Sequence, residues 1–188
     1  MSAHLPAALG GAALVLWVVF EFAVRPPQAG GPSPPAGGKD RGSTLVLVAA
    51  YVGAYVVLMW LPHVAALPAT VAWAGVVVAF LGLGLRAWAM RVLGVSYRRT
   101  LRTEGDQQLV TAGPYRVVRH PGYAGSLAVW LGYAASRGGG LALAVVALWM
   151  LAAYLWRMRA EEKMLVGRFG SAYEAYMART KRLIPGVY

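Results

Sequence analysis

The sequence predicts an all-α integral membrane protein with about five transmembrane helices and a cytoplasmic C-terminal region. Hydrophobic residues make up 59% of the 188 residues and charged residues only 13%, whereas a soluble domain has about 25% charged residues. The apolar residues form long runs, and Lys and Arg are concentrated between those runs. This composition excludes a soluble domain, a disordered chain and a nucleic-acid-binding module, although the net charge is +11.

The first predicted span covers residues 5–24, because about 20 apolar residues cross the ~30 Å hydrocarbon core of a bilayer. Glu21, near its end, is the only charged residue in this run. No Lys or Arg precedes the run and no A-x-A-like cleavage site follows it, so we interpret it as a retained helix rather than a signal peptide. Residues 25–43 are rich in Pro and Gly and predict a loose linker.

The second and third predicted spans cover residues 44–61 and 71–93, and an uncharged turn at 62–70 joins them. Arg86 lies inside the third span, about 10 Å from its end at the helical rise of roughly 1.5 Å per residue. A long cationic side chain at this depth either extends to the lipid headgroups or faces a cavity. We expect Arg86 to extend to the headgroups.

The fourth predicted span, residues 121–136, is short, and a glycine-rich turn at 136–140 connects it to a fifth span at 141–156. From Arg157 onward the mixture of apolar and charged residues predicts an amphipathic helix that follows the fifth span and ends near Arg179. A tail containing Pro185 completes the chain.

The distribution of Lys and Arg predicts the orientation of these spans. If the N-terminus lies outside, the segments 25–43, 91–119 and 157–188 all face the cytoplasm, and together they hold 16 of the 18 Lys and Arg residues. The opposite orientation would place these charges outside. We therefore predict an external N-terminus and a cytoplasmic C-terminus, with the basic segments facing anionic membrane lipids.

Metal and nucleotide chemistry of the common kinds is not expected. The chain has no cysteine and only three histidines, His4, His63 and His120, which are far apart in the sequence. It contains no glycine-rich dinucleotide motif, no P-loop and no HExxH zinc motif. The sequence therefore predicts neither a metal site nor a soluble-type nucleotide fold.

The densest polar cluster lies in residues 110–125, where the polar mid-chain segment meets the fourth span. Pro121 suits the first turn of a helix, and His120 before it is biased away from helical geometry. Free backbone N–H groups at a helix N-terminus attract anions. The cluster therefore suits a small anionic group such as a carboxylate, or else forms a basic, aromatic membrane-interface belt; its donors are Tyr115, Arg119, His120 and Tyr123.

A second candidate pair follows the fifth span. Arg157 and Glu161 are four residues apart and therefore share one face of a helix. Arginine before glutamate is the less favourable order for a simple helical ion pair, which hints at other partners. The alternative is ordinary membrane-flanking charge.

Five sequence segments together resemble the isoprenylcysteine carboxyl methyltransferase family, which is close to the phospholipid methyltransferases. They are LVTAGPYR at 109–116, RHPGYAG at 119–125, EEKML at 161–165, RFGSAYEAY at 168–176 and RLIP at 182–185. The resemblance covers about half of the chain, from residue 97 to residue 185. Residues 1–93 would then be an N-terminal three-span membrane region, and residues 94–188 a methyltransferase core.

The resemblance implies S-adenosylmethionine as cofactor, held by the cytoplasmic C-terminal half, and a lipophilic or prenylated acceptor that enters from the bilayer. Arg157 would orient the acceptor carboxylate, and Glu161 would bind the cofactor. The chain is similar to the short bacterial members, which predicts the plasma membrane of a bacterium. The other implied cofactor-binding residues are Gln107, Gln108, Leu109 and Val110, through backbone groups, and Tyr115, His120, Pro121, Gly122 and Tyr123.

The function implied by the resemblance is methyl esterification of a prenylcysteine-like carboxylate. A carboxylate acceptor is already anionic and needs alignment and a dry pocket rather than a general base. The alternatives are N- or S-methylation of a phospholipid amine or a lipophilic thiol, and a non-enzymatic small membrane protein. A transporter would show polar residues near the bilayer midplane and repeated halves, which this sequence lacks.

Overall fold

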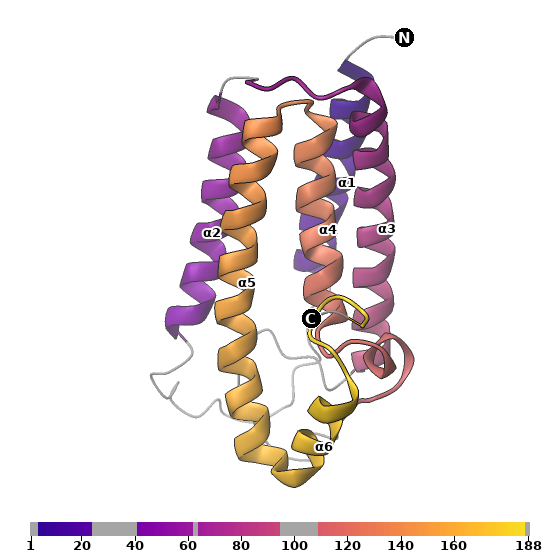
Figure 1. The fold of residues 1–188 in the computed structure, drawn as a ribbon, viewed down its shortest axis with the longest axis vertical. Coiled ribbons are helices and arrows are strands. Elements are labelled where there is room, and N and C mark those ends of the chain that lie inside the picture. The colour runs from indigo at the N-terminus through magenta and orange to yellow at the C-terminus, as the bar shows by residue number, and fades with distance from the viewer. Residues whose placement is uncertain (1–3, 24–40, 62–63, 95–108, 187–188) are drawn as a thin grey trace.

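The computed structural model describes residues 4–23, 41–61, 64–94 and 109–186, which form an all-helical bundle (Figure 1). Helices α1 to α5 stand side by side along the long axis, and α6 lies at one end. We call this the α6 end. Helix α1 packs against α3 and α4, whereas α2 packs against α5.

The first three predicted spans are helical, as expected. Helix α1 covers His4–Ala23, α2 covers Arg41–Trp60 and α3 covers Ala69–Leu93. Helix α3 stops at Gly94, whose φ of +50° is a left-handed conformation that glycine adopts readily.

Helix α4 covers Pro121–Ser136, as predicted, with Pro121 in its first turn and His120 immediately before it. The charged segment after Arg157 is helical and ends at Arg179, as predicted, but the predicted boundary between it and the fifth span is wrong. Helix α5 runs without interruption over Gly140–Phe169, since the sequence has neither proline nor glycine between residues 140 and 167. The break comes at Gly170, with φ of +51°, before the short helix α6, Ser171–Arg179.

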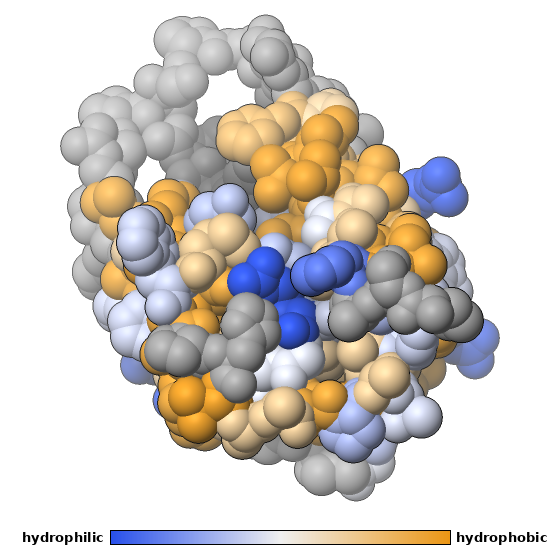
Figure 2. Space-filling view, turned by 90° about the horizontal axis from the view of Figure 1, so that it is seen from above, coloured by the Kyte–Doolittle hydropathy of each residue, from blue (hydrophilic) through white to orange (hydrophobic). Residues whose placement is uncertain are grey.

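Helices α1, α3 and α5 are each long and apolar enough to cross a membrane. Helices α2 and α4 run beside them (Figure 1). Figure 2 views the bundle from the end opposite α6, where hydrophilic side chains lie near the centre and apolar side chains surround much of them. Many large apolar side chains elsewhere are exposed, as lipid contact requires.

The closest helix pair, α3 and α4, meets through glycines. A Cβ atom on Gly132 would lie 2.5 Å from both the Ala79 nitrogen and the Gly75 oxygen, which belong to the backbone of α3. Only small residues let two helix backbones approach this closely. This contact fixes α4, and with it the residues around His120, against α3.

Gly132→Ala is therefore expected to destabilise the protein by about 1–3 kcal/mol, because a backbone cannot retreat as a flexible side chain can. Unfolding in detergent micelles measures this change. Gly84→Ala is the matched control: Gly84 lies on α3 with nothing within 4 Å of an added Cβ. Equal stabilities of the two variants would contradict the close packing described here.

Candidate active site

A cavity of about 820 Å³ extends from the α6 end into the middle of the bundle. One wall consists of apolar and aromatic residues of α1 and α2, several of which are exposed. The α6 end of the cavity is polar and is built by residues 109–123, α5 and α6. A polar site is thus joined to an apolar wall that reaches the surface of the bundle.

The residues singled out from the sequence converge on this cavity. Tyr115, His120, Gly122 and Tyr123 line its polar end, together with Leu109 and Val110 and the α5 residues Arg157 and Glu161. Pro121 is buried in the first turn of α4 beside them. Gln107 and Gln108 lie outside the described residues.

A buried carboxylate that the sequence analysis missed organises the polar end. Glu162, with 7% of its side chain exposed, accepts hydrogen bonds from Arg119 Nε at 3.0 Å and from Arg182 Nη2 at 2.7 Å. His120 Nε2 lies 3.3 Å from the same carboxylate. The anionic group expected near Arg119 and His120 is therefore present, but it belongs to the chain itself.

The C-terminal segment holds the loop before α4 in place. The backbone N–H groups of Arg119 and His120 donate to the carbonyl oxygens of Lys181 and Arg182, at 2.7 and 3.0 Å. Because Arg182 also binds Glu162, this segment connects the loop before α4 to helix α5. The sequence offered one signal for this contact, the RLIP segment at 182–185, but no partner for it.

Two tyrosines of α6 complete this end of the cavity. Tyr173 and Tyr176 are buried and line it. Burial raises the pKa of the Tyr176 phenol to about 12, so the hydroxyl stays protonated and donates to the Tyr115 carbonyl oxygen at 2.7 Å. This bond joins α6 to the turn at Gly113–Arg116.

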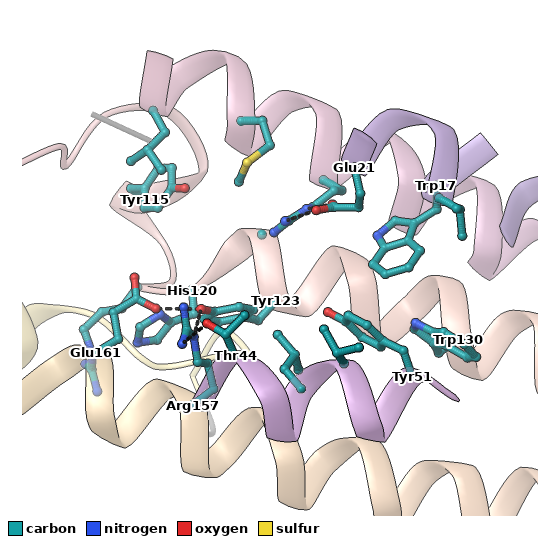
Figure 3. A pocket seen from close by; sticks show the side chains of 18 of the residues that line it. Trp17, Glu21, Thr44, Tyr51, Tyr115, His120, Tyr123, Trp130, Arg157 and Glu161 are labelled. Atoms are coloured by element: carbon teal, nitrogen blue, oxygen red, sulfur yellow. Dashed lines mark hydrogen bonds and ion pairs between the residues drawn. The ribbon is translucent and has the colours of Figure 1, made fainter. Parts of the chain in front are cut away.

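Arg157 and Glu161 meet at one hydroxyl group. The Tyr123 hydroxyl donates to Glu161 Oε2 at 2.8 Å and accepts a hydrogen bond from Arg157 Nε at 3.3 Å (Figure 3). Arg157 also donates to Thr44 Oγ1 of α2 at 3.4 Å. Only 4% of Arg157 is exposed. These contacts show that Arg157 is a buried, oriented group rather than exposed membrane-flanking charge.

The prediction that Arg86 extends to the lipid headgroups is wrong. Arg86 is buried and donates two hydrogen bonds to Glu21 of α1, at 2.7 and 3.1 Å. Its guanidinium packs against the start of α4, where a Cβ on Gly122 would lie 2.7 Å from Nη1. A partner on another helix makes burial possible, and the sequence gave no indication of that pairing.

The apolar part of the cavity contains an aromatic cluster, Trp17, Tyr51 and Trp130. The Trp17 and Tyr51 rings meet edge to face with centroids 5.0 Å apart, and Tyr51 stacks on Trp130 at 5.7 Å. The cluster joins α1, α2 and α4 one to two helical turns from Glu21 and Thr44 (Figure 3). It gives the deeper cavity a mainly apolar, aromatic surface suited to a hydrocarbon tail.

These features define what the arrangement can do chemically. Carboxylate, guanidinium and phenol groups gather beside an apolar compartment, which suits a polar reaction on a lipophilic molecule. Among the residues that the structure describes, no group of three or more His, Cys, Asp or Glu side chains is placed to hold a metal ion.

A comparison with family models matches residues 70–172 to the phospholipid methyltransferase family. This match confirms the family resemblance found in the sequence. The matched segment contains α4, α5 and all but the first residue of α3. It ends just before the two α6 residues that line the cavity, Tyr173 and Tyr176. Glu21 and Thr44 lie outside it.

Two curated relatives are isoprenylcysteine methyltransferases by name. A probable protein-S-isoprenylcysteine O-methyltransferase of Oryza sativa subsp. indica is 30% identical over 117 residues, which are 61% of each chain. The protein-S-isoprenylcysteine O-methyltransferase of Schizosaccharomyces pombe is 34% identical over 107 residues, 56% of this chain and 45% of that protein. The chain thus spans less than two thirds of the length of these relatives.

A solved structure shares the fold. The eukaryotic intramembrane Ras methyltransferase ICMT (isoprenylcysteine carboxyl methyltransferase) superposes with a TM-score of 0.64 at 22% identity, covering 97% of this chain and 68% of that one. Together with the long apolar helices, this likeness confirms an all-helical integral membrane fold.

Proposed function

Because the chain belongs to the phospholipid methyltransferase family, we propose that it uses S-adenosylmethionine to methylate a lipophilic acceptor, most closely a prenylcysteine-like carboxylate. The main support for this proposal is the cavity, which joins a polar site to an apolar wall formed by α1 and α2. The names of the two relatives support the carboxylate as the acceptor group. Residues 94–188 would form the methyltransferase core, and residues 1–93 the membrane region.

The residues at the polar end fit this cofactor, whose methionyl part carries an ammonium and a carboxylate beside a cationic sulfonium. Glu161 would take a cationic group, because its carboxylate lines the cavity and is already held by Tyr123. When bound, the cofactor supplies an electrophilic methyl group. The other residues that would hold it are Gln107, Gln108, Leu109 and Val110, through backbone groups, and Tyr115, His120, Pro121, Gly122 and Tyr123.

Arg157 would align the acceptor. A guanidinium binds a carboxylate through two parallel N–H donors, which fixes its direction as well as its distance. Tyr123 and Thr44 hold Arg157 from two sides, so that the acceptor meets a preoriented group. A carboxylate attacks without losing a proton, whereas an amine must first be deprotonated. The apolar walls exclude water from the reacting groups.

The proposed reaction requires that the cofactor-binding end face the compartment that contains S-adenosylmethionine. We place the N-terminus outside and the C-terminus in the cytoplasm of a bacterial plasma membrane, as the distribution of Lys and Arg predicts. In this orientation the α6 end and the polar end of the cavity face the cytoplasm, where S-adenosylmethionine is made. The acceptor tail would lie against α1 and α2 within the bilayer.

His120→Ala is expected to weaken the binding of S-adenosylmethionine by about 1–3 kcal/mol, the scale of a hydrogen bond that involves a charged group. His120 lines the cavity, contacts Glu162 and lies with its ring 5.6 Å from that of Tyr123, so its removal loosens three parts of the site. Isothermal calorimetry of purified protein measures the change. His4→Ala, at an exposed position of α1, is the control. Unchanged affinity in His120→Ala would refute this role.

The proposed function is tested with radiolabelled S-adenosylmethionine and three acceptors that share one farnesyl tail: a carboxylate, a thiol and an amine. We expect label to pass to the carboxylate well above the other two. Faster transfer to the amine or the thiol would instead assign N- or S-methylation. Absence of transfer to every acceptor, from protein that binds the cofactor, would argue against the proposed acceptor classes.

A further inference from the structure

Four residues from four helices form a polar neck between the cofactor end and the apolar part of the cavity. They are Glu21 of α1, Thr44 of α2, Arg86 of α3 and Arg157 of α5, and all four line the cavity. Glu21 lies across the cavity from Arg157 and Thr44 (Figure 3). An acceptor whose tail lies along α1 and α2 would have its headgroup at this neck.

The charges of the neck are unequal. Glu21 binds Arg86 through both carboxylate oxygens, so these two charges largely cancel. Arg157 has Tyr123 and Thr44, both uncharged, among its partners on the opposite side. Glu161 faces Tyr123 and, in the proposed function, the cation of the cofactor. Counted over these four side chains alone, the formal charge of the neck is +1.

We infer that Glu21, on a helix outside the segment shared with the family, determines which headgroups the neck accepts by cancelling the charge of Arg86. This inference rests on the function proposed above. The neck then suits a headgroup with one negative charge, such as a carboxylate, over a doubly charged phosphate monoester. Because 21% of the Glu21 side chain is exposed, against 9% for Arg86, the carboxylate itself is within reach of a headgroup.

The test compares two ligands with the same tail, farnesyl phosphate and farnesylamine, whose dissociation constants are measured by calorimetry on the full chain. The shared tail makes the ratio of the amine constant to the phosphate constant a measure of the headgroup alone. General damage to the cavity weakens both ligands and leaves the ratio unchanged. A change in the charge of the neck moves the two constants in opposite directions.

Glu21→Gln keeps the shape and removes the negative charge, so we expect the ratio to rise at least tenfold. Arg86→Gln removes the positive charge instead, and we expect the ratio to fall at least tenfold. The double variant has the net charge of the wild type, and its ratio should return to within about threefold of the wild-type value. Glu174→Gln, at an exposed position of α6, is the matched control.

An unchanged ratio in the folded single variants would overturn the inference, as would the same shift in single and double variants. If one single variant does not fold, the other still tests the inference, because a shift of its ratio in the predicted direction is specific to the charge that it removes. The ratio requires no catalysis, so it stands apart from the test of the proposed function. The proposed function is judged separately, by whether and to which acceptor the wild type transfers label.

Discussion

Replacing Glu162 with glutamine is expected to lower the free energy of unfolding by about 3–5 kcal/mol, the cost of removing one partner from a buried ionic network. The side chain is 7% exposed and is in contact with Arg119, Arg182 and His120. A neutral amide removes the negative charge that faces Arg119, whose side chain is 11% exposed, and Arg182, whose side chain is 26% exposed. Unfolding in detergent micelles, followed by circular dichroism, measures the loss.

Glu174→Gln makes the same chemical change at an exposed site of α6, and its stability should stay within about 0.5 kcal/mol of the wild type. We also expect Glu162→Gln to bind S-adenosylmethionine more weakly, because Glu162 positions His120 and the loop before α4 without lining the cavity itself. Equal stabilities of the two variants would contradict the central place given to Glu162.

Arg157→Lys is expected to lower the turnover of a carboxylate acceptor at least tenfold and to leave the affinity for S-adenosylmethionine nearly intact. A lysine ammonium is a point charge and cannot reproduce the planar, two-pronged grip of a guanidinium on a carboxylate. It also cannot contact Tyr123 and Thr44 with the same geometry, so the alignment of the acceptor is lost. Initial rates and calorimetry on the same preparation separate the two effects.

Arg159→Lys is the matched control, since Arg159 lies two residues along the same helix at an exposed position. Its turnover should match that of the wild type. Wild-type turnover in Arg157→Lys would argue against a carboxylate acceptor and towards an amine or a thiol, whose methylation depends less on this grip.

The helices were predictable because their causes are local. Runs of apolar residues, Pro121 in the first turn of α4 and Gly94 after α3 each act on neighbouring backbone. The wrong boundary at Arg157, between the fifth span and the charged helix, rests on a change from apolar to charged residues. A change in polarity does not end a helix, whereas Gly170 does.

The convergence of Tyr115, His120, Tyr123, Arg157 and Glu161 on one cavity was partly predictable, since they lie in segments that carry the family resemblance. The partners of the buried charges were not. Glu21 and Arg86 are 65 residues apart in the sequence. Neither residue type nor spacing indicates such a pairing, because it depends on how α1 and α3 pack.

The release of label by base tests most directly the claim that this chain makes a methyl ester. Purified protein is incubated with methyl-labelled S-adenosylmethionine and a farnesylated cysteine acceptor, and the extracted product is treated with alkali. We expect the label to be released as volatile methanol, because esters hydrolyse in base whereas N-methyl and thioether S-methyl groups do not. Label that stays with the lipid after alkali would contradict the account.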